Sequence, residues 1–486
     1  MAYTAANSSL NDWRKNSEVH RLAKTWAAPL VTLSLAAVVT QLPPPAPLNQ
    51  SSMYFLATLM AAIAFWIMEV FDQHVVAFLL LLSWLFSGIV PSKVALAGFS
   101  ENAWFFVIGA FAMGVSVNES GLLRRMGAAL LSHIPPRRYK LLTFILFGSG
   151  FVATPLLPLG RARAVLLGTF NKSIFHTTGF KPCSNGSAGL GLSTFLASGQ
   201  MSFMFLTGAA YGLAGWSLLP QSAKAEFGWL SWLIAALPAG IFSFLFLFAA
   251  THFVFPLTEE DRTHIANRFN GKQTETARPW SRNEWLSLVV VILSIVAWLS
   301  KPLHGIDESW VALAGMVAFL TSGVLDKKGF SSIDWGFLFF FAIVSSLGNI
   351  AMYLSVDKWL VSIMNPVFAL FSFHPLPFLL VIVLVAFVVR LFLKKITAAV
   401  VSTIVLIPWA TVMDIHPGVI LLAILIGMES WFLPYQDDSY QLVYNTTEGR
   451  SFSHAQARKI MIAKFVSAFL AIGLSYPYWK ALGYIN

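Results

Sequence analysis

The sequence predicts an all-α polytopic membrane protein with 11 transmembrane helices, two re-entrant hairpins and an inverted repeat. Composition is the first reason, because 57% of the 486 residues are hydrophobic and only 11% are charged, whereas soluble domains contain roughly 25% charged residues. The second reason is a series of apolar runs long enough to cross a bilayer. The third is that the two halves of the chain place similar segments in the same order.

Eleven apolar runs are separated by polar segments, and each is expected to span the membrane once. Six runs lie in the first half, at 26–42, 53–70, 74–90, 102–117, 186–216 and 229–255. Five lie in the second half, at 285–299, 310–325, 335–354, 416–444 and 457–482.

Two further apolar regions, 141–170 and 376–412, contain basic residues at their centres. We expect both to be hairpins that enter and leave the membrane on one side. Pro155, Pro158 and Gly160 supply a break at the first tip. Because irregular backbone at membrane depth must be buried in protein or face water, both tips should line a cavity.

Loop charges predict the topology of the chain. With residues 1–24 as a cytosolic N-terminal tail, the inner segments contain 18 further basic residues, from Arg124 to Lys464, while the outer segments contain few. This asymmetry favours a cytosolic N-terminus and an external C-terminus in a multi-pass protein of the inner cell membrane. A cytosolic linker at 259–283 separates a first half at 25–258 from a second half at 284–486.

Several classes of function are disfavoured by charge and composition. The net charge of +10 comes from bases scattered over short loops, so the positive-inside rule explains it better than a nucleic-acid partner. The single cysteine, Cys183, excludes a disulfide scaffold and a thiolate cluster. No cofactor is expected, and the partners are membrane lipids and a small solute.

The two halves share a repeated pattern. The segment NAWFFVIGAFAM at 102–113 is similar to DWGFLFFFAIVS at 334–345, and the tip LGRARAVL aligns with LKKITAAV. An odd number of spans in each copy gives the copies opposite orientations, which is the plan of secondary transporters. After 102–117, apolar residues at helical spacing predict a surface helix at 119–134.

Basic residues at both tips predict an anion site. The first tip offers Gly160, Arg161 and Arg163, and the second offers Lys394, Lys395 and Thr397. A charged side chain at membrane depth is costly unless it is paired or hydrated. The alternative is that individual bases reach the membrane surface or pair with an acid. Helix N-termini after each tip would add positive potential.

The fifth run contains Ser198, Gly199 and Gln200, which favour an unwound segment that binds a ligand. The alternative is a small-residue contact between helices. In the tenth run, Pro434 is expected to break the helix next to Tyr435 and Gln436. Three carboxylates lie close to this break, Glu429, Asp437 and Asp438. They could bind a coupling cation, take up a proton, pair with Lys394 or Lys395, or remain solvated at the rim.

Three segments resemble the divalent anion:sodium symporter family. They are AFWIMEVFDQHVVAFLLLLSWLFSGIV, FVIGAFAMGVSVNESGLLRRM and WFLPYQDDSYQLVYNTTEGRSFSHAQARK. The resemblance implies a scaffold domain and a mobile transport domain, a homodimer and an elevator-type movement. It also implies a substrate site between the hairpin tips and the unwound fifth and tenth helices.

The tips depart from the family signature, a Ser-Asn-Thr triplet that supplies sodium ligands in both hairpins. Neither tip has it, and fixed positive charge near such a site repels sodium. We therefore expect a secondary transporter of a dicarboxylate, sulfate or related oxyanion, and sodium coupling is not implied. The alternatives are an arsenite-type or cation-coupled carrier of another solute, an integral membrane enzyme and a channel. The paired tips favour a transporter over an enzyme or a channel.

Overall fold

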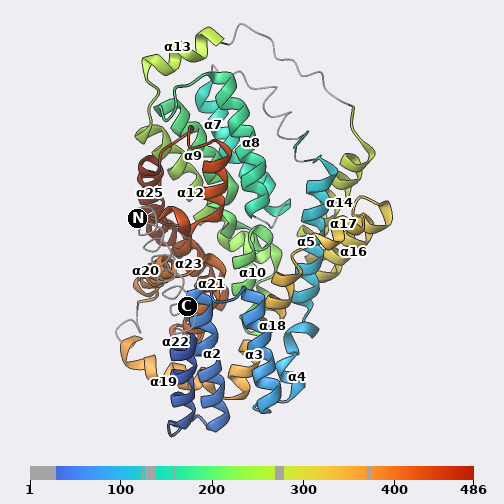
Figure 1. Cartoon of the computed structure of the whole chain (residues 1–486), viewed down its shortest axis with the longest axis vertical. Coiled ribbons are helices and arrows are strands. Elements are labelled where there is room, and N and C mark those ends of the chain that lie inside the picture. The colour runs from blue at the N-terminus through green and yellow to red at the C-terminus, as the bar shows by residue number, and fades with distance from the viewer. Residues whose placement is uncertain are drawn as a thin grey trace, which may run out of the picture.

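Figure 1 shows the chain as an elongated bundle of helices, in a computed structural model. The structure describes residues 29–122, 124–125, 138–156, 160–268, 279–368 and 374–485. These residues form no β-strand apart from an isolated bridge between Ile415 and Ile485. The predicted all-α class is confirmed.

Most predicted spans are single helices whose ends lie within a few residues of the predicted ones. They are α2 (Gln50–Met68), α3 (Gln73–Ser87), α5 (Asn102–Ser120), α12 (Trp229–Val254), α14 (Arg282–Leu299), α16 (Glu308–Ser322), α18 (Trp335–Tyr353) and α25 (His454–Ala481). The run predicted at 26–42 is helical over Pro29–Gln41. Short connecting helices are α4 (Ser92–Ala95), η1 (Ala97–Ser100), α11 (Gln221–Glu226), α13 (Glu259–Arg268), α15 (Lys301–His304), α17 (Lys327–Ser331), α19 (Val356–Phe368) and α22 (Trp409–Met413).

Local sequence signals set the ends of these helices. Asn49 and Ser281 are the N-caps of α2 and α14, and each forms a capping box with the residue three positions later. At the other end, α3, α5 and α16 stop at Gly88, Gly121 and Gly323 in the left-handed conformation. These signals are why the predicted and observed ends agree.

In the described part of the chain, seven helices are long and apolar enough to cross a membrane: α2, α5, α12, α14, α18, α20 (Pro375–Phe392) and α25. Six of them match predicted spans, and α20 is the first arm of the second predicted hairpin. The protein is therefore a polytopic membrane protein. Helix length does not distinguish an arm that turns back from one that crosses, so the total of 11 spans stays a prediction.

The fifth and tenth predicted spans are interrupted. The first divides into α9 (Asn185–Gly199) and α10 (Ala210–Ser217), with the turns η2 (Ser202–Met204) and η3 (Leu206–Gly208) between them. The second divides into α23 (Pro417–Met428) and α24 (Asp438–Thr446), with η5 (Pro434–Gln436) between them. The predicted unwinding is confirmed at both places. Each break leaves backbone carbonyls and amides without a helical partner.

The first predicted hairpin consists of α7 (Tyr139–Leu156) and α8 (Gly160–Thr178), and the second of α20 and α21 (Lys395–Leu406). Pro155 is the penultimate residue of α7, and Gly160 is the first residue of α8, so both lie next to the predicted break. A proline in the last turn removes the hydrogen bond to the carbonyl four residues earlier, which favours the end of the helix there. Residues 157–159, which include the predicted breaker Pro158, lie outside the described residues. The second break contains only Leu393 and Lys394.

The helices form two bodies. The α5 body contains α2, α3, α5, α14, α16 and α18, and in Figure 1 most of it lies at the right and bottom. The α9 body contains the two hairpins, both interrupted helices, α12 and α25. Contacts between the bodies are fewer than those within them, and they involve mainly α10 with α18 and α2 with α21.

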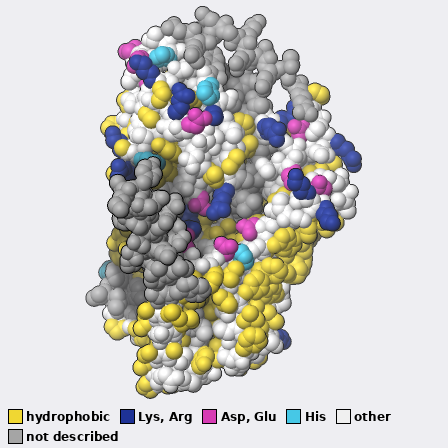
Figure 2. All heavy atoms as spheres, viewed as in Figure 1, with side chains coloured by type: hydrophobic (Ala, Val, Ile, Leu, Met, Phe, Trp, Pro, Cys, Tyr) yellow, Lys and Arg dark blue, Asp and Glu magenta, His cyan; other side chains and the backbone are white. Residues whose placement is uncertain are grey.

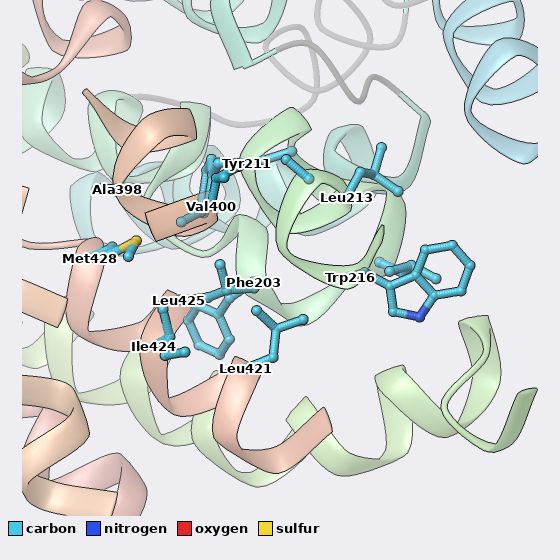
Figure 3. Close-up of a cluster of buried hydrophobic side chains, with 14 of the residues drawn as sticks. Phe203, Tyr211, Leu213, Trp216, Ala398, Val400, Leu421, Ile424, Leu425 and Met428 are labelled. Carbon is cyan, nitrogen blue, oxygen red and sulfur yellow. The ribbon is translucent and has the colours of Figure 1, made fainter. Parts of the chain in front are cut away.

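Each hairpin packs between halves of two different interrupted helices. The helix α8 packs against α9 and α24, whereas α21 packs against α10 and α23. Figure 3 shows apolar side chains at the second of these junctions, among them Leu213 of α10, Val400 of α21 and Leu421 of α23. This reciprocal pattern, in which each hairpin contacts one half of each interrupted helix, is what an inverted repeat predicts.

Two predicted surface segments are only partly described. The surface helix predicted at 119–134 falls largely on residue 123 and residues 126–137, which lie outside the described residues. Next to them, Arg125 pairs with Glu284 at a Nε–Oε2 distance of 3.0 Å. The predicted linker begins with α13, and its residues 269–278 also lie outside the described part.

Candidate functional site

Each hairpin tip has one exposed base that pairs with an acid. Arg161, in the first turn of α8, donates Nε to Oδ2 of Asp438 at 3.0 Å. Lys394, before α21, lies 2.8 Å from Oε2 of Glu69 on the α5 body. The side chains of Arg161 and Lys394 are 75% and 55% exposed. These two bases therefore lie at the rim of the site.

The second base of the first tip, Arg163, is fully buried in the break of the fifth span. It donates Nε to the carbonyl of Ser198 at 2.9 Å and Nη2 to Oγ of Ser202 at 2.8 Å. The Ser198 carbonyl is one of the last in α9, which have no partner within a helix. The Ser198 hydroxyl turns back to the Phe195 carbonyl, so Ser198 contributes its backbone to this contact.

The second base of the second tip, Lys395, forms a buried ion pair. Its Nζ lies 2.6 Å from Oδ2 of Asp437, and the two side chains are 17% and 1% exposed. Gln200 donates Nε2 to the same oxygen at 3.2 Å, and the Tyr440 amide donates to Oδ1 at 2.9 Å. The predicted pairing of Asp437 with Lys395 is present. Thr397 is also buried, and it accepts a hydrogen bond from Gln73.

Gly160 and Gly199 both lie close to Ser439, at the point where the first tip approaches the two interrupted helices. A Cβ atom on Gly160 would lie 3.4 Å from Oγ of Ser439, and one on Gly199 would lie 3.5 Å from it. The start of α8, the end of α9 and the first turn of α24 therefore meet at Ser439. Sequence reasoning did not include Ser439, although it follows directly after Asp437 and Asp438.

A second carboxylate, Glu429, is fully buried in the tenth break. The Tyr211 hydroxyl donates to its Oε1, and Nζ of Lys464 lies 3.9 Å from its Oε2. Lys464 donates to the Gln200 carbonyl at 2.6 Å. The assignment of Lys464 to an inner segment is wrong, because its side chain lies inside the protein with 1% exposed. A lysine ten residues into α25, with apolar residues on both sides of it, was the available signal.

The tenth break is held to the second tip by Arg390 and Gln436. Arg390 donates Nη1 to the Leu393 carbonyl at 2.8 Å and Nη2 to the Gln436 carbonyl. In return, Gln436 donates Nε2 to the Leu391 carbonyl at 3.1 Å. Pro434 and Tyr435 provide the backbone of η5 at this junction. Arg390 is only 1% exposed, so its side chain lies in the interior.

Six charged residues form what we call the buried charge cluster: Arg163, Arg390, Lys395, Lys464, Glu429 and Asp437. Four are basic and two are acidic, so the cluster has a formal surplus of two positive charges. Charge in a medium of low dielectric constant is costly unless it is compensated. The arrangement is therefore suited to an incoming anion. Figure 2 shows that exposed basic and acidic side chains also lie together near the middle of one face of the molecule.

Within the described residues, no group of three His, Cys, Asp or Glu side chains is arranged to hold a metal ion. The polar atoms of the site are instead amides, hydroxyls, ammonium and guanidinium groups, and carboxylates. Such a set recognises carboxylate or sulfate oxygens through charge-assisted hydrogen bonds.

Comparison with known proteins identifies the family. Residues 23–485 match the family described as Sodium:sulfate symporter transmembrane region. The chain belongs to this family. This membership confirms the resemblance seen in the sequence, and it makes the protein a member of a family of membrane transporters.

Relatives and a solved structure agree with this membership. The chain is 23% identical over 401 residues to a citrate/succinate antiporter of Escherichia coli (strain K12), covering 78% of this chain and 80% of the relative. It is 23% identical over 327 residues to the chloroplastic dicarboxylate transporter 2 of Spinacia oleracea, covering 65% and 57%. The crystal structure of the Alcanivorax borkumensis YdaH transporter superposes with a TM-score of 0.52 at 16% identity, covering 96% of this chain and 98% of that one.

Proposed function

We propose that this family member is a secondary active transporter of a small dianion, such as a dicarboxylate, sulfate or a related oxyanion. The observation that carries the proposal is the surplus of two positive charges in the buried charge cluster. A bound dianion would bring that surplus to zero. A neutral solute or a cation would leave the surplus or increase it, which disfavours an arsenite-type or cation-coupled carrier.

The relatives support a dicarboxylate among these dianions. The Escherichia coli relative is named a citrate/succinate antiporter and the Spinacia oleracea relative a dicarboxylate transporter. We infer that the substrate binds where the first tip, the end of α9 and Ser439 meet, next to Lys395. There, one carboxylate would replace Asp437 as the partner of Lys395, and the Asp437 charge would remain next to Gln200 and Arg390.

We further propose that transport is anion exchange without sodium coupling. Secondary transporters bind coupling cations with the carbonyls at the C-terminal ends of half-helices. In this protein, the Ser198 carbonyl already binds Arg163 and the Gln200 carbonyl already binds Lys464. A sodium ion at these carbonyls would be repelled by both side chains. We therefore expect exchange and not one-way transport, because a site that moved back across the membrane without an anion would carry uncompensated positive charge.

The proposed movement is of the elevator type. The few contacts between the α5 body and the α9 body support the interpretation that the α5 body is the scaffold and the α9 body is the transport domain. We place the protein in the inner cell membrane as a homodimer, with its N-terminus in the cytosol and its C-terminus outside.

Counterflow in proteoliposomes tests the function. Vesicles that contain the purified protein and unlabelled succinate would take up labelled succinate, with equal rates in sodium and potassium buffers. Sulfate and malate would be offered as competitors. Absence of exchange with every anion would refute the proposal, and flux that requires sodium would refute the sodium-independent form.

A further inference from the structure

A second polar contact joins the two bodies away from the anion site. Glu101, the N-cap of α5, lies in the α5 body, and Lys224 lies in α11, between α10 and α12 of the α9 body. Their Oε2 and Nζ atoms are 2.7 Å apart. The side chains are only 8% and 7% exposed, so this ion pair is buried at the boundary between the bodies.

Other groups complete the environment of this pair. Ser345 and Asn349 of α18 donate to the Glu101 carboxylate at 2.7 and 3.2 Å. Lys224 also donates to the carbonyl of Ser217, the last residue of α10, at 3.0 Å. Glu101 therefore receives donors from both bodies, and Lys224 binds acceptors from both.

The boundary beside the pair is otherwise loosely packed. A cavity of about 480 Å³ is lined by Glu101, Lys224, Trp216, Trp229 and Ser309, among others. The amide of Trp229 at the start of α12 donates to Glu308 of α16 across the same boundary at 3.1 Å. Ring contacts of Phe106 with Trp216 and of Trp229 with Trp298 also cross this boundary, so polar and aromatic contacts around a cavity hold the bodies together here.

The helix α10 connects this boundary to the anion site. Tyr211 near its start contacts Glu429 of the buried charge cluster, and Ser217 at its end contacts Lys224. These positions are about 9 Å apart along the helix, at 1.5 Å per residue. The exposed bases Arg161 and Lys394 mark the opening of the site, whereas the Glu101–Lys224 pair lies past the far end of α10.

We propose that the Glu101–Lys224 pair is a latch that holds the two bodies in the conformation in which the tips are open, and that it separates once in each transport cycle. The inference rests on the proposed elevator movement. Sliding of the α9 body along the α5 body separates the two side chains. Because both side chains are buried, their separation requires that water enters the cavity and hydrates both charges. This requirement favours two discrete relative positions of the bodies over a continuous range of positions.

Thiol accessibility tests the latch without any measurement of transport. In a Cys183→Ser background, Ser309→Cys places a reporter in the wall of the cavity, where Ser309 is 4% exposed. We expect Lys224→Met and Glu101→Gln each to speed its labelling by a membrane-impermeant maleimide about tenfold. Lys172→Met is the matched control, because it removes a lysine whose partner Glu448 belongs to the same body and lies away from this boundary. Unchanged labelling in both latch variants, or an equal rise in the control, would overturn the latch.

A crosslink covers the case in which the single variants fail to fold, because Glu101→Cys combined with Lys224→Cys removes both charges and leaves neither one buried without its partner. In the Cys183→Ser background, a short bifunctional maleimide that joins the two cysteines should stop succinate counterflow, whereas the same protein before crosslinking should exchange succinate. Full exchange by the crosslinked protein would contradict the latch. If labelling of the reporter responds as expected but no anion is exchanged by the unmodified protein, the proposed function fails and the latch stands.

Discussion

Each hairpin tip carries one exposed and one buried base, but the two buried bases have different kinds of hydrogen-bond partner. At the first tip, the Arg163 guanidinium bonds a backbone carbonyl and a hydroxyl. At the second, the Lys395 ammonium bonds the carboxylate of Asp437. An arginine fork fixes two acceptors at once, whereas an ammonium acts as a point charge that can change partner.

The difference assigns separate roles to the tips. The first tip is tied to the end of α9 by neutral acceptors that a substrate cannot replace, so Arg163 positions the site and adds positive potential. The second tip holds a base whose carboxylate partner has the same chemistry as one end of a dicarboxylate. Substrate can therefore compete with Asp437 for Lys395, and we expect Lys395 to be the more sensitive position.

The largest expected effect is that of Lys395→Met. It removes the base that receives the substrate and leaves Asp437 buried without its ion-pair partner, which costs about 3–5 kcal/mol. We expect counterflow to fall at least about 100-fold, because each 1.4 kcal/mol is about a tenfold change, and the melting temperature to fall with it. Initial rates of labelled succinate uptake and thermal unfolding in detergent measure the two effects.

Two further variants separate binding from folding at this position. Lys395→Met combined with Asp437→Asn removes both charges, so stability should recover while exchange should not. Lys172→Met is the matched control, because Lys172 pairs with Glu448 at 2.8 Å on an exposed surface of α8. Exchange that recovers in the double variant would show that Lys395 only stabilises the fold.

A smaller effect is expected at the first tip. Arg163→Lys keeps the charge but cannot reach both Ser198 and Ser202, so one buried acceptor loses its donor at a cost of about 1–3 kcal/mol. We expect the apparent KM for succinate to rise about tenfold, with less change in the maximal rate. Arg125→Lys, outside the site, is the control. If Arg163→Met matched Arg163→Lys in KM, the positive charge at this tip would be irrelevant to binding.

The sequence located both tips and both breaks because the responsible signals are local. Apolar runs interrupted by glycine, proline and charge mark places where a helix cannot continue unchanged through a membrane. The prediction thus included the buried bases Arg163 and Lys395 and the acid Asp437.

The sequence did not predict which of the two bases at each tip is buried. Successive residues in a helix are about 100° apart, so Arg161 and Arg163 point to different sides, but only the packing of α8 against α9 decides which side is the interior. Tyr211, Arg390 and Lys464 were missed as site residues for the same reason. Each joins the site through a contact with a segment distant in the sequence.

The smallest effects are expected from the exposed bases, and they sharpen the contrast with the buried ones. Arg161→Ala and Lys394→Met each break an ion pair that is largely solvated, which is worth about 0–1 kcal/mol. We therefore expect counterflow to fall by no more than about fivefold in either variant, and by less at high salt, because mobile ions already screen these pairs. The same uptake measured at two ionic strengths checks this. A loss as large as that of Lys395→Met would show that the substrate binds at the rim between Arg161 and Lys394, and that the buried bases only hold the tips in place.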